Sequence, residues 1–201
     1  MIIIKEALSK KDLKKFVKFP FSLYKDSKSW VPPIISEELR TFDKNINPVF
    51  QDADGRFFLA YKDGKIVGRV AALINWIEVK EQEIKKMRFG WIDVIDDQDV
   101  TNALLDKVAE IGKTNKLEFM EGPIGFSNLD KVGVVYEGFD HIGSMITWEN
   151  HPYYVKHLEA YGMTFGKGYS ENKKTSKENP KFCKTKRYHS TGMVSKYDAR
   201  I

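Results

Sequence analysis

The 201 residues suit one domain, and 13 Phe, 9 Tyr and 4 Trp supply enough bulky side chains for a core without cross-links. No stretch approaches the roughly 18 apolar residues that cross a bilayer, and the start lacks a signal-peptide pattern, so we expect a cytoplasmic protein without a membrane segment. The single cysteine, Cys183, excludes an intramolecular disulfide and a multi-cysteine zinc site.

The net charge of +5 is distributed unevenly along the chain. Residues 166–201 hold 10 Lys or Arg against 3 Asp or Glu, and the remaining 165 residues carry 23 against 25. A domain that binds nucleic acid is expected to carry its basic excess on the folded part. We therefore expect no specific nucleic-acid partner, and only non-specific binding to the tail stays open as an alternative.

The first third of the chain predicts a strand and two helices. The β-branched run Ile2–Ile4 indicates a strand, and Ser9 offers an N-cap for a helix that Pro20 is expected to end or kink. The prolines of 30–33 favour an extended turn, because each disfavours helix in the residue before it. A short helix is expected over 34–41.

The clearest local pattern follows. Asp63-Gly64 lies between the apolar runs 57–61 and 65–74, and Gly adopts the positive φ of a hairpin turn at little cost. Later elements are expected in this order: a strand at 87–95, a helix at 100–114 preceded by carboxylates that favour its N-terminus, a strand at 117–121, a possible strand at Gly143–Trp148 and a helix at 153–161. This order predicts an α/β fold with an open mixed sheet and helices on both faces.

Residues 166–201 have 9 hydrophobic residues in 36 and no sustained periodicity. Such a segment buries too little apolar surface to offset its ordering entropy. We therefore expect a domain over residues 1–165, followed by a basic polar tail that is disordered or not native in sequence.

The order of elements resembles the GCN5-related N-acetyltransferase (GNAT) superfamily. Several short motifs are similar to the N-terminal half of two-domain bacterial acetyltransferase-like proteins of unknown function. They are Lys18-Phe-Pro-Phe21, Trp30-Val-Pro-Pro33, Phe58-Leu-Ala-Tyr61, Gly64-Lys-Ile-Val-Gly-Arg69, Arg88-Phe-Gly-Trp91, Gly122-Pro-Ile-Gly-Phe126, Glu137-Gly-Phe-Asp140 and Pro152-Tyr-Tyr154. The resemblance covers about residues 1–165 and implies an acyl-CoA N-acyltransferase-like fold.

The resemblance also implies a chemistry, transfer of an acetyl group from acetyl-CoA to a small-molecule or peptide amine. In this superfamily a splayed strand holds the pantetheine arm through its backbone, and the next helix N-terminus binds the pyrophosphate. The cofactor-binding positions implied here are Ile92, Asp93, Val94, Gln98, Val100 and Thr101. Tyr154 would be the acid that protonates the leaving thiolate.

This chain departs from the superfamily at two places. The phosphate loop Gln/Arg-x-x-Gly-x-Gly/Ala is absent, and Asp96-Asp-Gln-Asp99 stands there instead. The position of the usual late-helix tyrosine falls near Leu158, so Tyr154 would serve only if the helix is offset. A degenerate, non-catalytic domain that binds a ligand or a partner half therefore remains the alternative function.

Glu121 lies at a predicted strand end before a Gly-rich turn, where a general base could stand or a carboxylate could simply face solvent. Asp93, Asp96, Asp97 and Asp99 could bind a cation through oxygen ligands, but their spacing does not match an EF-hand loop. Helix capping and solvation explain these aspartates without a metal, and no metal site is expected.

Overall fold

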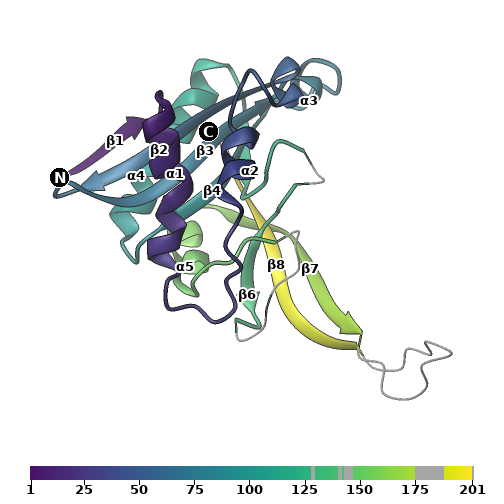
Figure 1. Cartoon of the computed structure of the whole chain (residues 1–201). Helices are drawn as coiled ribbons and strands as arrows, with labels where there is room; N and C mark the ends of the chain where they lie inside the picture. The colour runs from purple at the N-terminus through teal and green to yellow at the C-terminus, as the bar shows by residue number, and fades with distance from the viewer. Residues whose placement is uncertain (128–129, 140–141, 143–146, 175–187, 201) are drawn as a thin grey trace.

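The computed structural model describes residues 1–127, 130–139, 142, 147–174 and 188–200 (Figure 1). The elements are β1 (Ile2–Glu6), α1 (Lys10–Leu23), α2 (Ile35–Thr41), η1 (Pro48–Gln51), β2 (Ala53–Lys62), β3 (Lys65–Asn75), α3 (Trp76–Lys80), β4 (Lys86–Val94), α4 (Gln98–Thr114), β5 (Phe119–Gly122), β6 (Val134–Glu137), α5 (Tyr153–Ala160), β7 (Thr164–Lys174) and β8 (Tyr188–Arg200). No helix in these ranges is long and apolar enough to span a bilayer.

One eight-stranded mixed sheet organises the chain, in the order β1-β2-β3-β4-β5-β8-β6 with β7 also paired to β8. The strands β1 to β4 form antiparallel neighbours, and β4 and β5 are parallel. Two parallel strands need a long crossover connection between them, and α4 is that connection from β4 to β5. The expected open mixed α/β sheet is confirmed.

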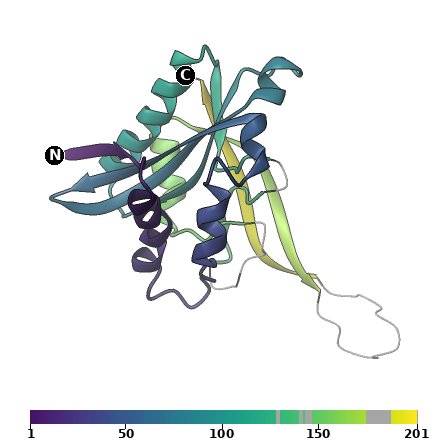
Figure 2. The same cartoon turned by 45° about the horizontal axis from the view of Figure 1, so that its top comes forward.

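Helices cover both faces of the sheet (Figures 1 and 2). Side chains alternate between the faces along each strand, so neighbouring residues of β2 enter different cores. Phe58 packs in the core below α4 and α5, whereas Phe57 packs with Phe16 of α1 and Phe42, which follows α2. The expected helices on both faces are confirmed.

The hairpin expected at Asp63-Gly64 joins β2 to β3, and both turn residues have positive φ, of 50° and 77°. The sequence predicted that Pro20 ends or kinks its helix. It does not end the helix, because α1 continues to Leu23 with Pro20 buried inside it. A proline in a helix interior removes one backbone donor. The carbonyl that loses this donor is that of Phe16, four residues earlier, and it takes a different partner, described below.

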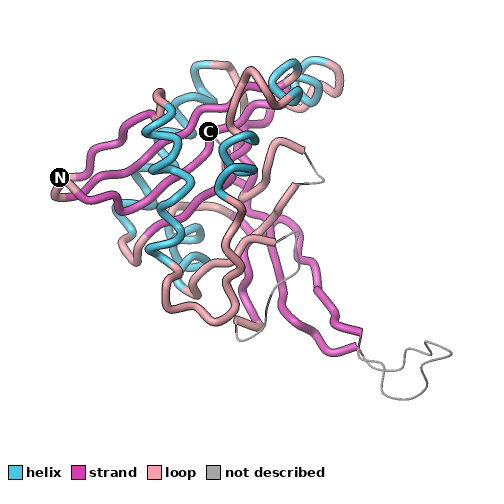
Figure 3. Tube along the Cα trace, viewed as in Figure 1, coloured by secondary structure: helices cyan, strands magenta, loops and turns pink. Residues whose placement is uncertain are grey.

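The described parts of the expected tail, residues 166–174 and 188–200, form strands. Residues 166–174 belong to β7 and 188–200 to β8, and these strands run alongside each other away from the helices (Figure 3). The end of β8 pairs with β5, from Tyr197 opposite Gly122 to Arg200 opposite Phe119. A backbone ladder depends little on apolar side-chain content, so composition alone could not predict this pairing.

The sequence did not predict β6 or α3. The strand expected at Gly143–Trp148 is not supported by its described part, since Thr147 and Trp148 lie in a loop, and residues 143–146 lie outside the described residues. Cys183 also lies outside them. The sequence near β6 is too short and too rich in glycine to show strand periodicity.

Gly90 allows β4 to approach the chain that follows β5. A Cβ at this position would lie 2.5 Å from the Ile124 carbonyl oxygen, which is closer than real contacts allow. We expect Gly90→Ala to lower the free energy of unfolding by about 1–3 kcal/mol, measured by urea denaturation. Lys113→Ala, at an exposed helix position, is the control and should stay within about 0.5 kcal/mol. An equally small effect of Gly90→Ala would contradict the close approach.

Candidate functional site

The sheet opens between β4 and β5. The parallel ladder joins Lys86–Arg88 of β4 to Phe119–Glu121 of β5, and one further bond runs from the Ile124 N–H to the Phe89 carbonyl at 2.8 Å. The strand β4 continues to Val94, past this last contact with the chain that follows β5. We call the edge of β4 over residues 92–94, beyond that contact, the splay.

A one-residue bulge in β4 shapes the splay. Ala71 of β3 lies opposite Gly90 of β4, and Arg69 lies opposite Asp93. One residue separates the two positions on β3 and two separate the two positions on β4, so β4 has one extra residue there. Trp91 lies in the bulge with φ of +45°, a conformation rare for a bulky residue. Its buried indole donates to Glu38 Oε2 at 3.1 Å and packs against Phe42. Strain that the surroundings hold in place is typical of functional sites.

Two tyrosines of α5 occupy the far end of the splay. The Val94 N–H donates to Tyr154 Oη at 2.9 Å, and Tyr153 Oη donates to the Val94 carbonyl at 2.7 Å. Burial raises the pKa of both phenols, with the Asp93 charge adding to the effect on Tyr154 and the charges of Asp96 and Asp93 adding to the effect on Tyr153. Both hydroxyls are therefore neutral at physiological pH.

Behind the splay lies a buried ion pair. Arg69 Nε of β3 donates to Asp93 Oδ2 of β4 at 2.7 Å, and both side chains are more than nine-tenths buried. The other Asp93 oxygen accepts from Tyr24 Oη at 2.8 Å. Arg69 also donates to the Phe16 carbonyl at 2.9 Å, the group that lost its helical donor to Pro20. This network joins α1 to the middle of the sheet.

Asp97 caps the N-terminus of α4. Its Oδ1 accepts from the N–H groups of Asp99 at 3.1 Å and Val100 at 3.4 Å, and its Oδ2 pairs with Lys62 Nζ at 2.7 Å. The hydrogen bond from Lys62 is the main reason that the pKa of Asp97 lies below its usual range. A carboxylate of the chain thus occupies N–H groups at this helix N-terminus.

His157 of α5 is buried against the first turn of α4. Thr101 Oγ1 lies 2.9 Å from His157 Nδ1, and Gln98 Nε2 donates to the His157 carbonyl at 3.0 Å. Asp96 Oδ1 lies 3.1 Å from His157 Nε2. These contacts fix α5, and with it the two tyrosines, relative to α4.

No family model matches the chain. It is 31% identical over 160 residues to protein YghO of Escherichia coli, covering 80% of this chain and 41% of the relative. It is 29% identical over 130 residues to the bacterial ceramide synthase of Caulobacter vibrioides, covering 64% and 34%. The chain therefore spans less than half the length of either curated relative.

Solved structures of GNAT-superfamily acetyltransferases share its architecture. A tandem GNAT protein from the clavulanic acid biosynthesis pathway superposes with a TM-score of 0.60 at 10% identity, over 87% of this chain and 48% of that one. A phosphinothricin acetyltransferase from Sinorhizobium meliloti, solved with AcCoA, gives 0.57 at 12% identity, over 100% and 88%. The chain has the GNAT fold. In it, the splay lies on the strand that the sequence resemblance assigned to the pantetheine arm.

The GNAT fold brings some predicted site residues together and separates others. Ile92, Asp93 and Val94 lie along the bulged end of β4 with Tyr154 beside them. Gln98 and Thr101 contact His157 instead of pointing free at the helix N-terminus. The Val100 side chain is fully buried in the core.

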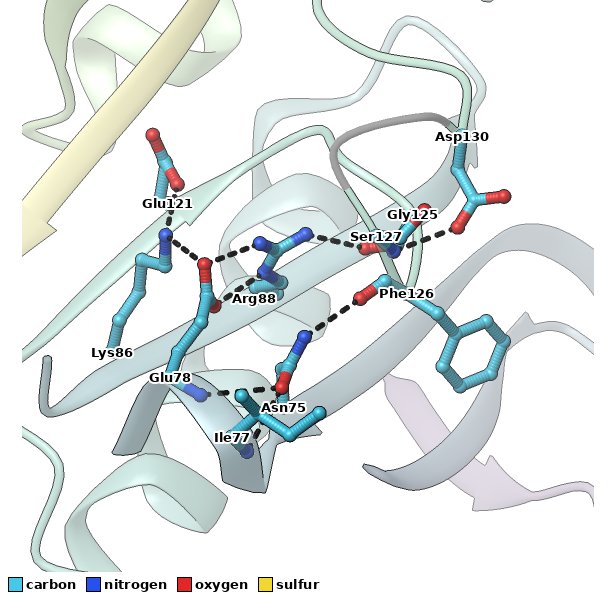
Figure 4. A network of polar contacts seen from close by, with 10 residues as sticks. All are labelled: Asn75, Ile77, Glu78, Lys86, Arg88, Glu121, Gly125, Phe126, Ser127 and Asp130. Carbon is cyan, nitrogen blue, oxygen red and sulfur yellow. Dashed lines mark hydrogen bonds and ion pairs between the residues drawn. The ribbon is translucent and has the colours of Figure 1, made fainter. Parts of the chain in front are cut away.

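Glu121 belongs to a different cluster, at the start of the β4–β5 ladder (Figure 4). Its Oε2 lies 2.9 Å from Lys86 Nζ, which also donates to Glu78 Oε1 at 3.1 Å. Arg88 in turn donates twice to Glu78, at 2.9 and 2.6 Å, and once to the Gly125 carbonyl at 3.2 Å. Glu121 is therefore an ion-paired carboxylate rather than a solvated edge residue.

Sequence reasoning missed Tyr24, Arg69 and Lys62, whose partners are distant in the chain. One signal was available, since a proline inside a helical pattern frees a carbonyl that needs another donor. Among the described residues, no group of three or more His, Cys, Asp or Glu is arranged to hold a metal ion. Asp97 acts as a helix cap and pairs with Lys62, Asp93 pairs with Arg69, and Asp96 lies beside His157.

Removing the Glu78 charge should destabilise the fold strongly. Burial alone would raise the pKa of Glu78, but hydrogen bonds from Arg88 and Lys86 outweigh it and lower the pKa. Glu78→Gln removes the carboxylate that Arg88 and Lys86 share. Lys86 keeps Glu121, but the buried charge of Arg88 loses this counter-ion, so we expect a loss of about 3–5 kcal/mol in the free energy of unfolding. Glu118→Gln, which breaks the exposed pair with Lys85, is the matched control and should cost less than about 1 kcal/mol. Equal losses of unfolding free energy in the two variants would contradict the idea that burial makes the Glu78 ion pairs more important than the exposed pair.

The Asp97 cap should make stability depend on acid. Its pKa is lowered on folding, so its contribution is present above the unfolded pKa of about 3.9 and is lost as pH falls through the lower folded value. Asp97→Asn keeps a capping side chain without the charge. We expect wild type to melt above this variant at pH 7, with the gap closing below about pH 4. Asp63→Asn, in the exposed β2–β3 turn, should show no such pH dependence, and a constant gap for Asp97→Asn would refute the ionic role.

Proposed function

We propose that the chain is a domain of an acyl-CoA-dependent N-acyltransferase that transfers an acetyl group from acetyl-CoA to an amine. The observation that carries the proposal is the splay, where β4 continues past the end of its ladder with β5 and turns backbone groups toward the gap. An amide-containing pantetheine arm has donors and acceptors that match such an edge. The proposal assigns this arm to Ile92, Asp93 and Val94.

The remaining roles follow from the same assignment. Gln98, Val100 and Thr101 would lie beside the pyrophosphate, at the N-terminus of α4. Tyr154 would protonate the thiolate that leaves, and Glu121 would take the proton of the attacking amine. Glu121 lies 2.9 Å from Lys86, which holds the carboxylate in place at the end of β5.

The acceptor is proposed to be a primary amine. One curated relative is called a bacterial ceramide synthase, and a ceramide is the N-acyl amide of a long-chain amino alcohol. Sphinganine therefore belongs in an acceptor screen beside short amines and peptides. Since the chain spans 34% of that relative, the activity is proposed for a protein in which this domain is one part.

The second candidate is a degenerate domain that binds a ligand or a partner half without chemistry. Two observations favour it. The Asp97 carboxylate occupies N–H groups of α4 that a pyrophosphate would use, and the two tyrosine hydroxyls occupy both backbone groups of Val94. A ligand would have to displace these internal partners, and each displacement lowers its affinity.

Calorimetric titration of the full chain separates the two candidates. We expect acetyl-CoA to bind saturably, with a Kd between about 1 μM and 1 mM. ADP, which lacks the pantetheine arm, is the control for phosphate binding by the basic residues, and a salt series removes such binding. Release of CoA thiol would then be measured with water, sphinganine and short amines as acceptors.

The outcomes are distinct. Binding of acetyl-CoA but not of ADP, with amine-dependent thiol release, supports the acyltransferase. Equal binding of acetyl-CoA and S-acetylpantetheine would mean that Asp97 excludes the pyrophosphate and that the arm alone is recognised. No binding up to about 1 mM and no thiol release would reject the enzyme in favour of the non-catalytic domain.

A further inference from the structure

Tyr24 connects the two faces of the sheet through the splay. It caps the C-terminus of α1 on one face, and its hydroxyl lies 3.1 Å from that of Tyr154, which belongs to α5 on the other. Both tyrosines are buried, with 3% of each residue exposed. The same Tyr24 hydroxyl lies 2.8 Å from Asp93 Oδ1 and 3.0 Å from the Glu149 carbonyl.

Counting protons limits the direction of these hydrogen bonds. Tyr24 has one hydroxyl proton, and both the Asp93 carboxylate and the Glu149 carbonyl can only accept. With the proton of Tyr24 on Asp93, the charged and closer acceptor, Tyr154 can donate to the Tyr24 oxygen at 3.1 Å or, over a longer 3.5 Å, to the Val94 carbonyl. The shorter contacts run from Tyr154 through Tyr24 to Asp93.

We propose that Tyr24 is the positioning residue for Tyr154 in the acyl transfer, an inference that rests on the proposed function. The Tyr154 oxygen is an alternative to Asp93 and the Glu149 carbonyl as acceptor for the proton of Tyr24. When Tyr154 turns its proton toward a ligand, Tyr24 can turn its own toward the Tyr154 oxygen. Asp93 loses one hydrogen bond but keeps Arg69 at 2.7 Å.

This turn of the Tyr24 proton toward Tyr154 assists the departure of the thiolate in acyl transfer. The amine nitrogen bonds to the thioester carbonyl carbon, the C–S bond breaks, and its electron pair moves to sulfur. Sulfur takes the proton of Tyr154, the nitrogen gives one proton to Glu121, the base assigned above, and exchange with solvent then restores both groups. The transient Tyr154 phenolate is stabilised by two donors, the Val94 N–H and the Tyr24 hydroxyl. Without Tyr24, only one donor remains.

This role is distinct from packing. The Tyr24 ring stacks on His151 at 5.1 Å between centroids and lies 5.6 Å from the Trp30 ring, and Tyr24→Phe would keep both contacts. The variant removes only the hydroxyl. Tyr161→Phe is the matched control, because it removes a hydroxyl of α5's C-cap that donates to Asp106 at 2.9 Å, outside the network.

The test measures CoA thiol release from acetyl-CoA by the full chain, with water, sphinganine and short amines as nucleophiles. We expect Tyr24→Phe to lower kcat roughly tenfold or more and to change the KM for acetyl-CoA less than about twofold. Tyr154→Phe should lower kcat at least as far. The double variant should be no slower than Tyr154→Phe alone, because Tyr24 acts only through Tyr154.

Each result decides the matter. Tyr161→Phe should leave kcat unchanged. If wild type is active and Tyr24→Phe matches Tyr161→Phe, or if the losses of Tyr24→Phe and Tyr154→Phe simply add, the positioning role is wrong while the enzyme stands. If wild type releases no thiol with any nucleophile, the proposed function and this role fall together.

Discussion

The buried ion pair of Arg69 and Asp93 is the constraint on which the site depends. Two charges more than nine-tenths buried are costly unless hydrogen bonds satisfy them, and here the further partners come from α1 and its C-cap residue. Arg69 donates to the Phe16 carbonyl, which has no helical donor because of Pro20, and Asp93 accepts from the Tyr24 hydroxyl. The position of α1 on the sheet, and the direction in which its last residues point, follow from satisfying this pair.

The opening of the sheet creates a second requirement, because a strand edge without a neighbour leaves polar backbone groups that must find partners. The two tyrosines of α5 meet it at Val94, where one hydroxyl accepts from the N–H and the other donates to the carbonyl. His157 holds α5 in place through Thr101 and Asp96. At Val94 the edge is therefore satisfied by the chain itself, and a ligand amide would have to exchange places with the tyrosine hydroxyls there.

Local patterns in the sequence predicted the elements whose causes are local. Asp63-Gly64 dictates its hairpin, and Asp97 begins α4 because its side chain accepts from N–H groups within three residues. The pairing of Tyr24 with Asp93, 69 residues away, has no such signature. The ladder between β5 and residues 197–200 also has no local signature, because composition does not determine which distant backbone segments pair. The position of Glu121 at a strand end was predictable, but its pairing with Lys86 depends on the β4–β5 register.

The aspartates before α4 change what the N-terminus of this helix can bind. A helix N-terminus at the end of a sheet attracts anions, and in this chain the Asp97 carboxylate takes that place with its charge offset by Lys62. A pyrophosphate arriving there meets bonded N–H groups and the negative charges of Asp96 and Asp99. If the domain binds an acyl thioester, most of the recognition must therefore come from the splay and its tyrosines rather than from the nucleotide. The donor is then selected by its amide-containing arm, which is the part that passes the reacting carbonyl to the amine.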